Sequence, residues 1–212
     1  NFWGAAYAQA YRGQLEGVTL VDHNAPFKTY LTQGKRLVTP RSTFYQRPID
    51  WWEGVLDSDV HLSVAAPGLV EIKVAPLIEP IAPETAVFDL GNDILIQQAE
   101  LTWEADDTLL LSVDWQAQNG NLADYSIAIH LVAQDPPTGP QDILDQADRN
   151  HPVAGRYPTS RWQTGEVVSS HYRLAVPPDT QPIAVRVSMY QVTQEGSFVN
   201  TEWLSLSIPE RP

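Results

Sequence analysis

The sequence predicts an all-β protein, an antiparallel β-sandwich of the immunoglobulin-like or jelly-roll-like kind. Three observations point to this class. Apolar and polar residues alternate with a period of two in several segments of strand length. Turn-forming pairs such as Pro177-Pro178 and Glu195-Gly196 bound those segments. Seventeen prolines among 212 residues also disfavour long helices, because proline lacks a backbone donor and blocks the preceding turn.

The first 85 residues predict a short N-terminal segment followed by a small β subdomain. Residues 1–25 start with an apolar, aromatic run that has no charge before Arg12. This run predicts either a short helix docked on the domain or an interfacial, membrane-proximal segment. Residues 26–85 are the expected subdomain, and Pro67-Gly68 predicts a hairpin within it. Strands are expected at residues 17–21, 35–38, 60–64 and 69–74.

Residues 86–212 predict a larger, acidic β-sandwich domain. The proline-rich stretch Pro76–Pro83 is interpreted as a linker or an edge crossing between the two subdomains. A short helix is expected at residues 141–148. Alternating rows predict strands at residues 109–115, 125–131, 168–176, 183–189 and 204–208.

Charge and composition exclude several classes of protein. The formal net charge is −13, which argues against binding to nucleic acid because that requires an excess of Lys and Arg. The chain has no cysteine, which excludes disulfides, thiolate metal sites and cysteine nucleophiles. No apolar run approaches the length of a membrane span. The charge is uneven: residues 1–92 hold 7 basic and 10 acidic residues, and residues 93–212 hold 6 and 16.

One stretch of the acidic chain is basic and aromatic. No acid occurs between Asp22 and Asp50, whereas five bases do, and aromatic residues lie among them. Such a patch attracts an anionic lipid headgroup surface and can also hold a phosphate or a sugar. The alternative is a solvated loop and strand whose charges pair with acids elsewhere. The residues predicted to contact an anionic headgroup or a glycan are Lys35, Arg36, Arg41, Arg47, Trp51 and Trp52, with the two tryptophans on opposite faces of a strand.

The sequence predicts no catalytic centre, metal site or cofactor. Asp57-Ser58-Asp59 is interpreted as a turn, and the five histidines lack the spacing of a zinc site. There is no nucleophile elbow and no Gly-rich phosphate loop. A hydrolase built on a carboxylate pair is the weakest alternative, because no such pair stands out. For His130, which lies between two apolar residues, we expect a structural hydrogen bond.

A recognisable motif occupies the segment Ala99–Gln191. It comprises a tryptophan strand (LLLSVDWQA, 109–117), a tyrosine–His-Leu strand (DYSIAIHL, 124–131), YPTSRWQTGEVV (157–168) and LAVPPD (174–179). This pattern resembles the soluble β-sandwich at the C-terminus of polytopic bacterial glycosyltransferases of the dolichyl-phosphate-mannose mannosyltransferase type. The resemblance covers less than half of the chain. Residues 134–156 depart from it, being longer than the family's short hairpin.

The resemblance implies a non-catalytic accessory module outside the cytoplasm, tethered to the membrane in the full-length protein. The family's catalytic acids lie in the transferase body and match no position here. Within the motif, His130, Tyr157, Trp162 and Glu166 are expected to be structural. The implied partners are an upstream membrane domain or the membrane surface, and a glycan. The alternative is a freestanding cell-surface or assembly protein that uses the sandwich as a scaffold for protein partners; fold alone does not decide between them.

Overall fold

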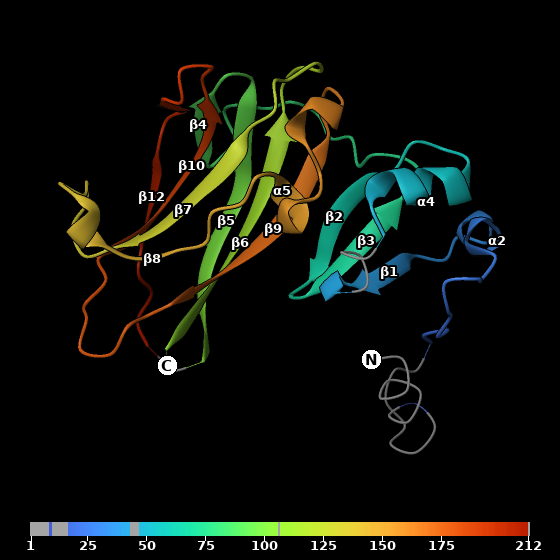
Figure 1. Cartoon of the computed structure of the whole chain (residues 1–212), viewed down its shortest axis with the longest axis horizontal. Helices are drawn as coiled ribbons and strands as arrows, with labels where there is room; N and C mark the ends of the chain where they lie inside the picture. The colour runs from blue at the N-terminus through green and yellow to red at the C-terminus, as the bar shows by residue number, and fades with distance from the viewer. Residues whose placement is uncertain (1–8, 10–16, 43–46, 106, 212) are drawn as a thin grey trace. The chain divides into compact units, whose positions relative to one another are not determined.

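A computed structural model describes residues 9, 17–42, 47–105 and 107–211. The chain divides into two compact units, Asn1–Lys35 and Arg36–Pro212 (Figure 1). In the first unit, helix α2 (Phe27–Thr32) follows Pro26, and the Lys35 ammonium lies 5.0 Å from the centre of the Tyr30 ring. The strand expected at residues 17–21 is wrong: this segment is irregular, and Gly17 has a φ of 75°, which ends extended backbone. Most of the apolar N-terminal run lies outside the described residues.

A small antiparallel sheet opens the second unit. Strands β1 (Leu37–Pro40), β2 (His61–Ala66) and β3 (Leu69–Lys73) pair in the order β1-β3-β2. The predicted hairpin is confirmed, because Pro67-Gly68 joins β2 to β3 and Gly68 has a φ of 82°. Leu62, Val70 and Ile72 are buried in this sheet.

Trp51 and Trp52 lie on a helix, so their predicted placement on a strand is wrong. Helix α4 (Ile49–Leu56) follows Pro48, which occupies its N-cap, and Asp50 lies in its first turn. Trp52 and Leu56 are both buried and stand four residues apart, which is the spacing of one helix face. Burial of that face favours a helix over a strand. Two adjacent tryptophans by themselves show neither the helical nor the strand period.

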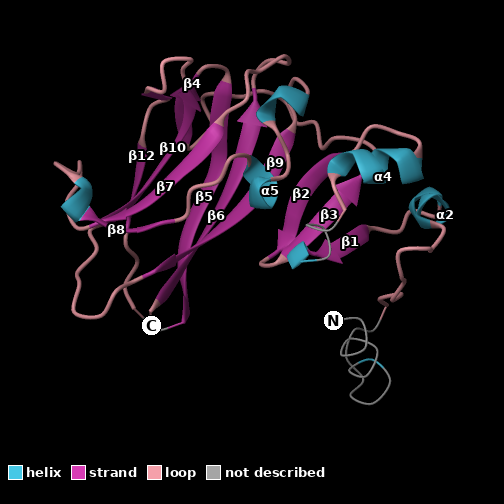
Figure 2. Ribbon diagram, viewed as in Figure 1, coloured by secondary structure: helices cyan, strands magenta, loops and turns pink. Residues whose placement is uncertain are grey.

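Two antiparallel sheets form the β-sandwich predicted from the sequence (Figures 1 and 2). The first sheet has the order β4-β5-β6-β9, with β4 (Phe88–Gly91), β5 (Ile94–Ala105), β6 (Thr108–Ala117) and β9 (Val167–Ala175). The second has the order β11-β10-β7-β8, and β12 also pairs with β10. Its strands are β7 (Ser126–Val132), β8 (Ile143–Gln146), β10 (Ala184–Val192), β11 (Phe198–Asn200) and β12 (Leu204–Ser207).

The sandwich core consists of the apolar sides of the alternating rows. Leu111 and Trp115 of β6, Ile129 of β7 and Val187 of β10 are all completely buried. The helix expected at 141–148 is wrong: a single 3₁₀ turn, η1 (Pro140–Asp142), leads directly into β8. β8 forms because its backbone pairs with β7, a long-range contact that local sequence does not encode.

The proline-rich stretch 76–83 runs beside the start of β9. The backbone N–H of Val167 donates to the Leu77 carbonyl, and that of Glu79 donates to the Gly165 carbonyl. Gly165 has a φ of 78°, and a Cβ there would lie 2.9 Å from the Glu79 carbonyl oxygen. Glycine is therefore required where the chain turns into β9. Residues 36–212 form one compact unit, and the boundaries predicted at residues 25 and 85 remain predictions.

Candidate anion-binding site

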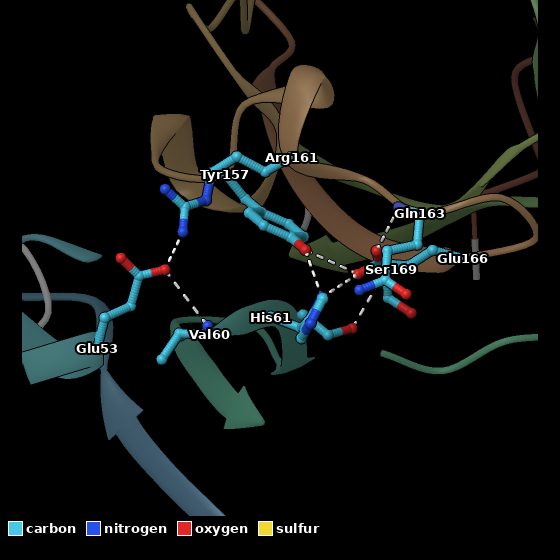
Figure 3. A network of polar contacts seen from close by, with 9 residues as sticks. Glu53, Val60, His61, Tyr157, Arg161, Gln163, Glu166 and Ser169 are labelled. Carbon is cyan, nitrogen blue, oxygen red and sulfur yellow. Dashed lines mark hydrogen bonds and ion pairs between the residues drawn. The ribbon is translucent and has the colours of Figure 1, made fainter. Parts of the chain in front are cut away.

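A buried polar network joins the small sheet to the sandwich (Figure 3). The Tyr157 hydroxyl donates to Glu166 Oε1 at 2.8 Å, and His61 Nδ1 lies 2.8 Å from the Tyr157 oxygen and 3.1 Å from Glu166 Oε1. With the hydroxyl donating to the carboxylate, the pattern assigns the Nδ1–H tautomer to His61. The second carboxylate oxygen of Glu166 accepts the backbone N–H of Gln163 at 2.9 Å.

The position of this network makes it structural. His61, Tyr157 and Glu166 are no more than 5% exposed, and none of them lines either of the two cavities described below. Burial, followed by the charge of Glu166, raises the pKa of Tyr157, so that its hydroxyl stays protonated and serves as a donor. A buried carboxylate is stable only when it is paired and hydrogen-bonded, and each partner here meets that need.

Two further contacts hold the small sheet against the sandwich. Glu53 of α4 pairs with Arg161, which lies in the 3₁₀ turn η2 (Thr159–Arg161), and the backbone N–H of Ser169 donates to Ser63 Oγ at 3.3 Å. Strand β2 therefore lies beside β9, as Figure 1 also shows. The small sheet is held against the sandwich by polar contacts from α4, β2 and β9.

A cavity opens where the β2–β3 hairpin meets β9 and the turn before it. Its volume is about 90 Å³, enough for several water molecules or one small polyatomic anion. Arg41, Arg149, His171 and Arg173 line it, and no acidic side chain does so within the described part of the chain. The hairpin residues at its mouth are exposed, so solvent reaches the cavity.

The charged side chains that line this cavity are basic. Arg173 pairs with Glu104, with Nη2 2.6 Å from Glu104 Oε1, and this contact keeps the pKa of Glu104 below its usual value. Arg149 donates from Nη1 to the Asp148 carbonyl at 2.6 Å, and this acceptor is neutral. Within the described residues, Arg149 has no ion pair with a carboxylate. Three arginines line this cavity, one of them paired with Glu104, and an arginine cluster of this kind favours an anionic ligand.

A strained turn forms one wall of the cavity. Val153, Ala154 and Gly155 in α5 (Pro152–Gly155) have φ values of 50°, 61° and 81°. Left-handed backbone is costly for a β-branched residue such as Val153, which is also fully buried. The backbone N–H of Val153 donates to Ser170 Oγ at 3.1 Å, which ties the turn to β9. Such strain concentrates at binding sites, because the surrounding fold has to maintain it.

The predicted contact residues fall in different places. Lys35 belongs to the first unit, and Arg36 donates two hydrogen bonds to Glu71, of 2.7 and 2.9 Å. Arg47 lies over the Trp51 ring at 4.9 Å, and Trp52 is buried in α4. Among the six, Arg41 is the residue that lines the cavity. The prediction that the six contact one anionic surface remains a prediction.

The four motif residues have structural contacts. His130 Nε2 lies 3.2 Å from Gln146 Nε2 and 3.4 Å from Asp148 Oδ1. Trp162 is 2% exposed, and its ring centre is 6.3 Å from that of Tyr157. Tyr157 and Glu166 belong to the buried network. All four contacts are internal to the fold.

Sequence reasoning missed Arg149, His171 and Arg173 as site residues. His171 and Arg173 stand on the polar side of the alternating row 168–176, and that side was a usable signal. Arg149 offered no such signal, because only the fold brings residue 149 next to residue 41. Comparisons with protein-family models, with curated proteins and with solved structures gave no match to this chain.

Proposed function

We propose that this chain is a non-catalytic accessory module that binds an anionic group, in a membrane protein of the glycosyltransferase type. The observation that carries the proposal is the convergence of Arg41, Arg149 and Arg173 on one solvent-open cavity without an acidic lining residue among the described residues. This occurs in a chain with twice as many acids as bases. A cluster of arginines at one cavity in such a chain is a site for phosphate or carboxylate.

The assignment of the module to a membrane protein of the glycosyltransferase type depends on the motif in Ala99–Gln191. The large apolar residues of the motif that resembles the glycosyltransferase-linked sandwich, such as Trp115, Ile129 and Trp162, are buried in the core, and Tyr157 and Glu166 belong to the buried network. An extracytoplasmic, membrane-tethered location follows from that resemblance and belongs to the same proposal. Within the described part of the chain, no helix has the length and apolarity to cross a membrane. The anionic group is then carried by a lipid headgroup or by a glycan.

The direct test is titration of the full chain with inorganic phosphate at low salt. We expect binding that weakens as salt is added, because ions screen exposed charges. Arg149→Gln should weaken binding about tenfold, which corresponds to the loss of one charge-assisted hydrogen bond. Calorimetry or amide chemical shifts measure both effects.

The matched control is Arg211→Gln, which removes the same charge from a residue that lies over the Trp103 ring. This variant should bind phosphate as the parent does. A second arm uses phosphatidylglycerol vesicles and separates a headgroup from a soluble anion. Failure to bind phosphate and vesicles alike, or equal losses in both variants, would refute the proposal.

The scaffold alternative retains one supporting observation. Val192, Phe198 and Val199, at the end of the β10–β11 hairpin, are 56%, 68% and 53% exposed. Exposed apolar clusters of this kind mark protein contacts. The alternative predicts an oligomer in light scattering that Phe198→Ser dissociates. A single-chain mass at every concentration contradicts it.

A further inference from the structure

A second cavity lies over the outer face of the first sandwich sheet. Its volume is about 170 Å³, and Gln98, Ser112, Asp114, Ser169 and His171 line it. These residues come from three neighbouring strands, β5, β6 and β9. Cross-strand pairing places Asp114 beside both Gln98 and Ser169, and Ser112 beside His171. They form one compact patch, because paired residues on one face of a sheet lie about 5 Å apart.

Four polar side chains of this patch are without a hydrogen bond in the described part of the chain. Gln98, Ser112 and Asp114 make no side-chain hydrogen bond within the described residues, and neither does His171. His171 Nδ1 is buried without a partner there, which is costly unless a water or a ligand satisfies it. Burial lowers the pKa of His171, with Asp114 acting in the opposite direction, so a neutral imidazole faces the cavity at pH 7.

The two cavities adjoin one another. Val64 of β2 and His171 of β9 line both of them. On one side of His171 lie the arginines, which suit an anion. On the other side lie a carboxylate, an amide and two hydroxyls, which suit the hydroxyl groups of a ligand because each can accept and most can donate a hydrogen bond. The arginine-lined cavity and the polar cavity therefore meet at His171.

We propose that the two cavities form a composite site for the phosphate monoester of a sugar or another polyol. The phosphate lies against Arg41, Arg149 and Arg173, and the hydroxyl groups bind Gln98, Ser112 and Asp114. This inference rests on the proposed function and adds the chemical class of the ligand. Asp114 gives the site its selectivity, because a second phosphate in the polar cavity would face a carboxylate.

The test compares three probes on the full chain: inorganic phosphate, glucose 1-phosphate and glucose. We expect glucose 1-phosphate to bind at least tenfold more tightly than inorganic phosphate, since each added hydrogen bond contributes a factor of a few. Glucose alone should show no measurable binding. Asp114→Asn combined with Ser112→Ala should remove the advantage of the sugar phosphate and leave the affinity for inorganic phosphate within about twofold.

The control variant is Asp179→Asn, which removes an exposed carboxylate from a turn where φ is 60° and asparagine is well tolerated. It should leave all three affinities unchanged. Equal binding of phosphate and glucose 1-phosphate overturns the composite site but leaves anion binding intact. Absence of binding to all three probes and to the phosphatidylglycerol vesicles overturns the proposed function itself, so the two failures are distinguishable.

Discussion

Replacing Glu166 with Gln is expected to lower the free energy of unfolding by about 3 kcal/mol, the cost of breaking a buried, hydrogen-bonded charge. One carboxylate oxygen accepts from Tyr157 and lies against His61, and the other accepts the Gln163 N–H. An amide has only one accepting oxygen. Whichever way it is placed, its NH₂ group faces a donor in a site where Glu166 is 1% exposed.

Urea unfolding followed by circular dichroism measures this loss. Glu195→Gln, in an exposed turn, removes the same charge and should change stability by less than about 0.5 kcal/mol. Tyr157→Phe supplies the second arm. If the network acts as a unit, the double variant should lose less than the sum of the single losses. Additive losses, or a Glu166→Gln variant as stable as the parent, would show that these contacts do not stabilise the fold as one network.

Trp162→Ala is expected to cost about 4 kcal/mol, as large-to-small substitutions in a packed core do. The indole is 2% exposed and packs near the Tyr157 ring. Its Nε1 is buried without a hydrogen-bond partner in the described structure, so the ring stabilises through packing alone. Thermal and urea unfolding give the change.

Trp162→Phe is the matched control, because it keeps an aromatic ring and removes the unpaired N–H. Its cost should be about half that of Trp162→Ala, because phenylalanine leaves a smaller cavity than alanine. If Trp162→Ala left stability unchanged but altered the binding of phosphate or sugar, Trp162 would be a contact residue and not a structural one. The two variants together thus separate the structural role expected for the motif from a binding role.

The sandwich was predictable because strand alternation is a local property. Leu109, Leu111, Val113 and Trp115 read as one face from the sequence, and all four are buried. The turn at Pro67-Gly68 was equally local, since glycine supplies the positive φ. Strand β5 was not predicted, because Ile94-Leu95-Ile96 breaks the alternation and all three side chains are buried.

The binding site was only partly predictable. The sequence indicated Arg41 within a basic stretch, but the structure directs the other bases elsewhere. Lys35 belongs to the first unit, Arg36 pairs with Glu71, and Arg47 lies over the Trp51 ring. The sequence analysis predicts Trp51 and Trp52 on opposite faces of a strand, whereas burial of Trp52 with Leu56 on one face of α4 decides for a helix. A run of basic residues in the sequence shows how many charges the segment has. The path of the backbone decides where each of those side chains lies.

What the sequence alone determined is the fold class, the core rows and the uneven charge, because these depend on periods and counts along the chain. Tertiary structure decided the site. It brought Arg41 to Arg149 and Arg173, and it placed His171 between a cationic and a polar cavity. Those residues are up to 132 positions apart in the sequence, and only the docking of the β2–β3 hairpin on β9 closes that distance.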